Sequence, residues 1–317
     1  MTGGMAVPRA TSPLARKRFS QKALRNNIDA YTFLLPTLIL FSVFTVYPFL
    51  NAFMVSMTNW DGLTEAKFIG LQNFSRLMGD AKVWKYLGNN LQFGVFTVFF
   101  KVFLGFVIAL FLNERFKGVA FFRGVFFVPV MMSFVAIGML WKWIYSPSSG
   151  LINSILFKLG LMNQANMITW LGDAKLAMYC IIIVDIWRWT GYHVVIFLAG
   201  LQTIPNELYE AAIVDGANDR QQLRYITLPQ MYSITLTNMI FCMTGAVSVF
   251  DLIFTMTGGG PYNVTKTIAI HVYEIAFGSS NKFGYATAIN ILLFFIILVI
   301  TTVMIQWMNR VRKNTCT

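Results

Sequence analysis

Long apolar stretches alternate along this chain with shorter polar ones, and their length matches the thickness of a membrane. A helix needs about 20 mostly apolar residues to cross the roughly 30 Å hydrocarbon layer. Six stretches meet that length, at residues 31–55, 91–113, 121–145, 176–200, 231–256 and 285–308. The pattern predicts an all-α, polytopic membrane protein whose six-helix transmembrane bundle occupies residues 29–310.

The overall composition also indicates a membrane protein. Of the 317 residues, 56% are hydrophobic and 12% are charged, whereas about 25% of the residues of a soluble domain are charged. The net charge of +12 could suggest a nucleic-acid partner, but the basic residues are scattered over short loops and tails without interleaved aromatics. We therefore expect contact with the lipid bilayer and no nucleic-acid binding.

The basic residues favour one orientation of the spans. The tail 1–28 holds several Lys and Arg and no acid. With this tail inside, the cytoplasmic segments carry basic residues at higher density than the longer outer loops, as membrane insertion favours. A cleaved signal peptide is the alternative, but the first apolar run is longer than a signal core and lacks a small-residue cleavage site. We expect both the tail 1–28 and the tail 311–317 to be cytoplasmic.

Residues typical of catalysis or metal binding are sparse. Cys180, Cys242 and Cys316 are far apart and form no CxxC pair, and His193 and His271 each stand alone. No zinc-protease or nucleophile motif is present. The sequence predicts that this chain is not an enzyme and holds no metal.

One polar segment, residues 201–230, has the signals of a helical hairpin. Pro205 can begin a helix that Gly216 ends in a left-handed conformation. Asn218 or Asp219 can cap a second short helix that stops before Pro229. The spacing alone leaves two interpretations open, a knob that fits a cleft in another protein and an amphipathic hairpin that rests on the membrane.

The same segment resembles the EAA motif of ABC importer permeases. Its positions are Glu210-Ala211-Ala212, then Gly216 after three residues, and Ile226-Thr227-Leu228-Pro229 after nine more. Four further blocks resemble carbohydrate-uptake permeases related to the larger maltose permease subunit: Leu35-Pro36 with Tyr47-Pro48, and residues 68–74, 198–205 and 257–261. We expect the chain to differ from that subunit by having neither its extra N-terminal spans nor its large periplasmic insertion.

The resemblance implies a type I importer fold, transport of a sugar, and a place in a bacterial or archaeal cell membrane. It implies four kinds of partner: a second homologous permease, two ATPase subunits that bind the ATP and Mg, an extracytoplasmic solute-binding protein, and the sugar. In that family the loop docks in a cleft of the ATPase. Carried onto this chain, the docking residues are Glu210, Ala211, Ala212, Asp215, Gly216, Ala217, Ile226, Leu228 and Pro229.

Polar residues inside the predicted spans mark a candidate substrate path, because such residues tend to face a bundle interior or an aqueous cavity. The candidates are Asp185, Trp187, Arg188, Tyr192, Asn238 and Asp251. Their hydrogen-bonding groups and aromatic faces suit a sugar. Alternatively, Asp185 and Arg188 neutralise each other three residues apart, and Asn238 holds two helices together. We expect Lys101 and Lys142 to reach water or pair, outside the path.

Two other functions are compatible with a membrane bundle. In an ion-gradient-driven secondary carrier or a channel, Asp185, Arg188 and Asp251 would be ion sites, and a membrane scaffold would transport nothing. The segment 257–261 is no phosphate loop, because no Gly-Lys-Ser/Thr follows its glycines. Aromatic residues of the outer loops form either an interfacial belt or a docking surface; they are Trp60, Trp84, Tyr86, Trp170, Tyr262 and Tyr273.

Overall fold

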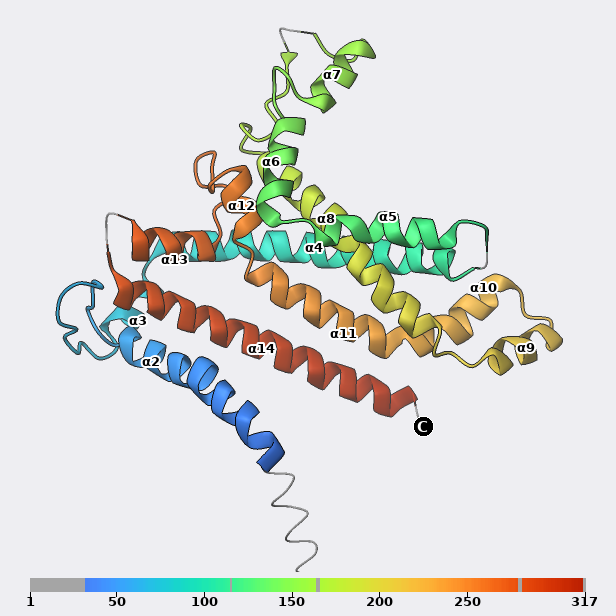
Figure 1. The fold of residues 1–317 in the computed structure, drawn as a ribbon, viewed down its shortest axis with the longest axis horizontal. Coiled ribbons are helices and arrows are strands. Elements are labelled where there is room, and N and C mark those ends of the chain that lie inside the picture. The colour runs from blue at the N-terminus through green and yellow to red at the C-terminus, as the bar shows by residue number, and fades with distance from the viewer. Residues whose placement is uncertain (1–31, 115, 164–165, 279–280, 316–317) are drawn as a thin grey trace, which may run out of the picture. The chain divides into compact units, whose positions relative to one another are not determined.

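The computed structural model describes residues 32–114, 116–163, 166–278 and 281–315 (Figure 1). These residues form helices and loops, and the only strand-like feature among them is an isolated bridge between Thr58 and Phe68. The chain divides into two compact units, residues 1–52 and 53–317. The predicted tail 1–28 and Cys316 lie outside the described residues. The all-α prediction is confirmed.

The described part of the first unit belongs to a continuous apolar helix, Thr32–Ser56, which agrees with the predicted span 31–55. Its middle, η1 (Ser42–Val46), is a π-helical turn that leads into α2 (Tyr47–Ser56). Pro48 has no N–H to donate to the preceding turn. The wider turn, in which the N–H of Tyr47 bonds to the carbonyl of Ser42, accommodates this proline without ending the helix.

The second unit contains the other helices. They are α3 (Gln72–Met78), α4 (Ala81–Asn113), α5 (Val119–Met131), α6 (Phe134–Ile144), α7 (Leu151–Lys158), α8 (Ala177–Leu201), α9 (Asn206–Val214), α10 (Asp219–Gln222), η3 (Leu223–Thr227), α11 (Leu228–Val247), α12 (Asp251–Met256), α13 (Ile268–Phe277) and α14 (Phe283–Thr315). Helix α14 continues through residues 311–315, which the sequence predicted as a tail.

Some of the six predicted spans are single helices, and others are broken. Within the described residues, four helices are long and apolar enough to cross a membrane: Thr32–Ser56, α4, α8 and α14. The third predicted span divides into α5 and α6, whose axes differ by 99° at Met132 and Ser133. The fifth also breaks, because α11 ends at Val247 and α12 begins at Asp251. As one uninterrupted helix, the predicted span 231–256 is wrong.

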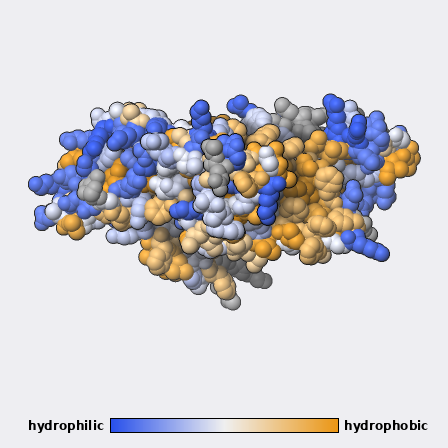
Figure 2. Space-filling model, turned by 90° about the horizontal axis from the view of Figure 1, so that it is seen from above, coloured by the Kyte–Doolittle hydropathy of each residue, from blue (hydrophilic) through white to orange (hydrophobic). Residues whose placement is uncertain are grey.

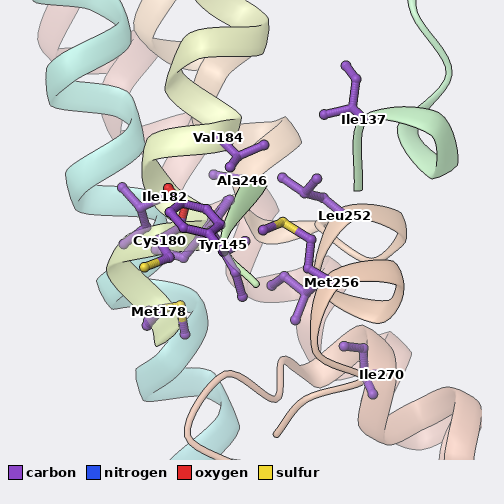
Figure 3. Close-up of a cluster of buried hydrophobic side chains, with 13 residues drawn as sticks. Ile137, Tyr145, Met178, Cys180, Ile182, Val184, Ala246, Leu252, Met256 and Ile270 are labelled. Atoms are coloured by element: carbon purple, nitrogen blue, oxygen red, sulfur yellow. The ribbon is translucent and has the colours of Figure 1, made fainter. Parts of the chain in front are cut away.

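Helices α4 and α8 pack along each other at the centre of the second unit, with α5 and α11 against them (Figure 1). Buried apolar side chains form three clusters around this pair. In the first cluster, Leu252 and Met256 of α12 lie near Val184 of α8 and Ala246 of α11 (Figure 3). The face drawn in Figure 2 carries a broad field of hydrophobic residues, as lipid contact requires.

Small residues let the central helices approach closely, as is common in membrane bundles. A Cβ at Gly105 of α4 would lie 2.7 Å from the Cβ of His193 on α8. A Cβ at Gly191 of α8 would overlap the carbonyl oxygen of Phe126 on α5. Both contacts involve atoms that the helices hold in place.

We expect Gly191→Ala to destabilise the protein, because the new methyl group must push α5 away from α8. The expected cost is about 1–3 kcal/mol, typical of an overpacked site. It can be measured as a lower midpoint of thermal aggregation for the purified protein in detergent. Gly124→Ala is the control, since a Cβ at Gly124 meets nothing within 4 Å. Equal midpoints for the two variants would contradict the close packing.

At one end of the second unit, polar contacts join α3 to the end of α2 and α14 to the start of α4. The buried amide of Asn73 donates to the carbonyls of Ser56 and Thr58, at 2.8 Å each. The hydroxyl of Tyr285 donates to Asp80 at 2.7 Å. Burial acts to raise the pKa of Asp80, but hydrogen bonds from Tyr285 and from the backbone N–H of Lys82 outweigh it, so this pKa lies below its usual value.

Candidate functional site

A cavity of about 380 Å³ lies among α4, α6, α8, α11 and α12. Its polar and charged lining comprises Lys101, Asp185, Tyr192, His193, Ser248 and Asp251. Its aromatic lining comprises Phe93, Phe134, Trp189, Phe241 and Phe250. A few convergent polar groups among aromatic faces are typical of small-molecule sites, and sugars use both kinds of contact.

A buried ion pair forms part of the cavity wall. The ammonium of Lys101 on α4 contacts the carboxylate of Asp185 on α8, and both side chains are about 5% exposed. An ionised group at this depth is costly unless an opposite charge compensates it. The pair therefore joins the two central helices, and it places Lys101, which the sequence analysis left outside the path, in the cavity lining.

Arg188 stabilises the break between α5 and α6. Its Nη2 donates to the carbonyl of Met132 at 2.9 Å, and its guanidinium carbon lies 3.3 Å from the centre of the Phe134 ring. The carbonyl at such a break has lost its helical partner and needs another inside a membrane. Asp185 therefore forms its salt bridge with Lys101, whereas Arg188 contacts the backbone between α5 and α6.

Asn238 lies behind the cavity wall. Its side chain is fully buried, and its Oδ1 is 2.6 Å from Nδ1 of His193. An amide oxygen can only accept, so His193 carries a proton on Nδ1 and donates it. The contact joins α8 to α11 and fixes the orientation of a ring that lines the cavity.

The break between α11 and α12 brings Ser248, Phe250 and Asp251 to the cavity. Asn90 of α4 compensates the break, because its buried amide donates to the carbonyl of Val247 at 2.9 Å and accepts from the N–H of Ile268 at 2.8 Å. Thr267 donates to the carbonyl of Val249 at 3.2 Å. These bonds allow a non-helical turn to persist within a membrane bundle.

The structure thus separates the predicted path residues into three groups. Asp185, Tyr192 and Asp251 line the cavity. Asn238 and Arg188 do not line it but contact residues or backbone beside it. Trp187 lies away from it, in an apolar groove between α4, α5 and α8. The sequence analysis missed Lys101 and His193, although the high cost of a charge inside an apolar span could have indicated Lys101.

The segment 201–230 forms the predicted hairpin. Helix α9 begins after Pro205, and Gly216 follows it with a positive φ of 77°. Asn218 caps α10 in a reciprocal pair of bonds with Gln221. Among the predicted docking residues, Glu210, Ala211, Asp215 and Gly216 are exposed, and Ala212 is half-buried.

The second arm of the hairpin differs from the prediction. Helix α10 runs through η3 directly into α11, so the chain stays helical from Asp219 to Val247 and does not stop before Pro229. Pro229 lies in the first turn of α11, where its missing N–H follows a π turn. Of the other predicted docking residues, Ala217 and Ile226 are half-buried, while Leu228 and Pro229 are exposed.

Comparison with known proteins finds relatives that match this chain over most of its length. Relatives include a probable ABC transporter permease of Pyrococcus horikoshii, 37% identical over 87% of this chain and 94% of the relative. A multiple sugar-binding transport system permease of Streptococcus mutans is 36% identical over 89% of this chain and 95% of the relative. The trehalose/maltose transport system permease of Thermococcus litoralis is 33% identical over 90% and 94%.

A solved structure has the same fold. A chain from a bacterial ABC transporter involved in the import of the acidic polysaccharide alginate superposes with a TM-score of 0.79 and 25% sequence identity, covering 92% of this chain and 98% of that one. Residues 101–313 match the family described as the inner membrane component of binding-protein-dependent transport systems. This protein belongs to that family of multi-pass membrane permeases.

Proposed function

We propose that this chain is a permease subunit of an ATP-driven sugar importer and forms half of its translocation path. The observation that carries this proposal is the uninterrupted helix from Asp219 to Val247, which runs from the hairpin to the cavity. Exposed helix α9 connects through α10 and η3 to α11, and the residues that follow α11 line the cavity. A force applied to the hairpin can therefore reach the cavity along a rigid element.

The surface of α9 suits a protein partner. Ile213 and Val214 are 63% and 88% exposed, next to the exposed acidic residues Glu210 and Asp215. Apolar side chains rimmed by charges typify protein interaction sites. The partner we propose is one of two ATPase subunits that hold ATP and Mg, which leaves the chain itself without a cofactor and without catalysis. Because these ATPases are cytoplasmic, this function requires α9 and both termini to lie in the cytoplasm.

The substrate we propose is a sugar, delivered by an extracytoplasmic solute-binding protein and enclosed between this chain and a second, homologous permease. Trp189, Tyr192 and Phe250 can stack against the C–H faces of a sugar ring, and Ser248 and Asp251 can bond to its hydroxyls. The sugar transport named for the relatives in Streptococcus and Thermococcus supports the same substrate class.

Energised membrane vesicles distinguish this function from an ion-gradient-driven carrier. We expect the tagged chain to retain an ATPase and a second permease in mild detergent. We expect vesicles that contain the binding protein to take up radiolabelled maltose, lactose or arabino-oligosaccharide only when ATP is present, with ionophores having no effect. Uptake that ionophores abolish, by a chain purified without an ATPase, would contradict the proposal.

A further inference from the structure

Helix α9 is anchored to the rest of the second unit by one large side chain. Among its residues only Tyr209 and Ala212 are partly buried, and the others are exposed. The Tyr209 ring packs against the apolar cluster around Leu201, Ile204 and Met231. Its hydroxyl lies 2.9 Å from Oγ1 of Thr227. Tyr209 therefore links the exposed helix to the segment that leads into α11.

The direction of this hydrogen bond follows from the second contact of Thr227. Its Oγ1 donates to the carbonyl of Gln222 at 3.4 Å. A threonine hydroxyl has a single proton, so the proton between the two side chains comes from Tyr209. A chain of hydrogen bonds thus runs from Tyr209 through Thr227 to the backbone of Gln222, and Thr227 itself is only 5% exposed.

This chain of bonds ends at the π turn η3. In that turn the N–H of Leu228 bonds to the carbonyl of Leu223, five residues earlier. The Thr227 hydroxyl spans the same interval to Gln222 and supports the wide register. Isolated π turns are rare in proteins overall, and those that occur often lie at functional sites. Tightening such a turn to the α-helical register would rotate everything that follows it. It would also press the ring of Pro229 against the carbonyl of Tyr225, so the tighter register needs an applied force.

Helix α11 follows the turn without interruption to Val247. It carries Asn238, which bonds to the cavity residue His193, and it ends at the break that contributes Ser248 and Phe250 to the lining. A rotation that begins at Thr227 would therefore move both the His193 contact and the cavity wall. A switch of η3 between the π register and the α-helical register would supply the two-state element that coupling between distant sites requires.

We propose that Tyr209 and Thr227 are positioning residues that transmit movement of α9 to the cavity through the register of η3. This inference rests on the proposed function, because it takes the ATPase as the source of the movement. It predicts that loss of the Tyr209 hydroxyl alone separates ATP hydrolysis from the change in the cavity.

The test uses the full complex with its ATPases in proteoliposomes and needs no sugar. Ser248→Cys reports access to the cavity through its rate of reaction with a charged maleimide. The background carries Cys316→Ser and Cys242→Ala, because the free thiol of Cys242 lines the same cavity. The measured quantity is the ratio of the rates with and without ATP and vanadate. In the Tyr209→Phe variant, the effect of ATP and vanadate on the labelling rate should be roughly five-fold smaller than in its parent, which is the factor for one lost hydrogen bond. The ATPase should stay bound and hydrolyse ATP.

Matched variants separate transmission from a general structural effect. Tyr225→Phe removes a hydroxyl from an exposed tyrosine of η3 and should leave the ratio unchanged. Thr227→Ser keeps the hydroxyl and should also leave it unchanged, whereas Thr227→Val should match Tyr209→Phe. The double variant Tyr209→Phe/Thr227→Val should be no worse than Thr227→Val, because both act on one chain of bonds.

The outcomes distinguish this inference from the proposed function. If ATP leaves the labelling rate unchanged in the otherwise unaltered complex, the proposed function is contradicted and the inference falls with it. If ATP changes the rate equally in the Tyr209→Phe variant and its parent, only the inference is overturned. A fall in ATP hydrolysis that matches the fall in the labelling ratio would also overturn it, because Tyr209 would then act on ATPase docking.

Discussion

Lys101→Met should greatly reduce the yield and thermal stability of folded protein, because it leaves the Asp185 carboxylate buried without its cation. Both side chains of the pair are about 5% exposed. Removing one partner of such a pair typically costs about 3–5 kcal/mol. The midpoint of thermal aggregation, followed by fluorescence-detected size-exclusion chromatography in detergent, measures the loss.

The double variant Lys101→Met/Asp185→Leu should recover most of that stability. Replacing both charges with apolar groups of similar volume removes the need to compensate either of them. Lys85→Met, at an exposed position of the same helix α4, is the control for losing a lysine. Equal midpoints for the Lys101→Met and Lys85→Met variants would show that the Lys101–Asp185 pair does not hold α4 against α8.

The ion pair illustrates what the sequence could not predict. Asp185 and Arg188 are three residues apart, so a local rule pairs them with each other. The structure instead pairs Asp185 with Lys101 on another helix and turns Arg188 to the carbonyl of Met132. Such partners depend on how helices pack and on where they break, and neither is encoded in the spacing of residues within one helix.

Features determined by neighbouring residues were predicted well. The long apolar helices, the start of α9 after Pro205, the left-handed Gly216 and the cap at Asn218 all follow from local chemistry. The predicted stop before Pro229 failed because a π turn accommodates the proline, and no local signal distinguishes such a turn from a helix end. The break at residues 248–250 was not predicted, for a related reason: Asn90, on a distant helix, forms the hydrogen bonds that stabilise it.

The cavity depends most on such long-range partners, which explains why its lining was predicted only in part. The polar character of the fourth and fifth spans was visible in the sequence. Of the six path residues predicted from it, Asp185, Tyr192 and Asp251 line the cavity. Which polar residue faces the cavity and which faces a neighbouring helix is decided by packing. Asn238 and Tyr192 can both donate and accept hydrogen bonds, yet Asn238 is fully buried and Tyr192 lines the cavity.

Glu210→Arg should abolish transport while the protein stays folded and inserted. Glu210 is an exposed residue of α9 and shares its surface with the exposed apolar residues Ile213 and Val214. If this surface docks in a cleft of the ATPase, the reversed charge is buried against groups selected for the opposite sign. We expect affinity for the ATPase to fall about tenfold or more. Co-purification of the ATPase and the ATP hydrolysis of the complex in detergent measure this loss.

Glu65→Arg is the matched control for that experiment. It makes the same charge reversal at an exposed glutamate in the loop before α3, at the end of the helices opposite α9 (Figure 1). Because ATP hydrolysis is measured without the solute-binding protein, contacts made by the Glu65 loop do not enter the result. Thermal stability should be unchanged in both variants, since neither side chain is buried. A Glu210→Arg complex that keeps its ATPase and hydrolyses ATP normally would contradict docking of α9 against the ATPase.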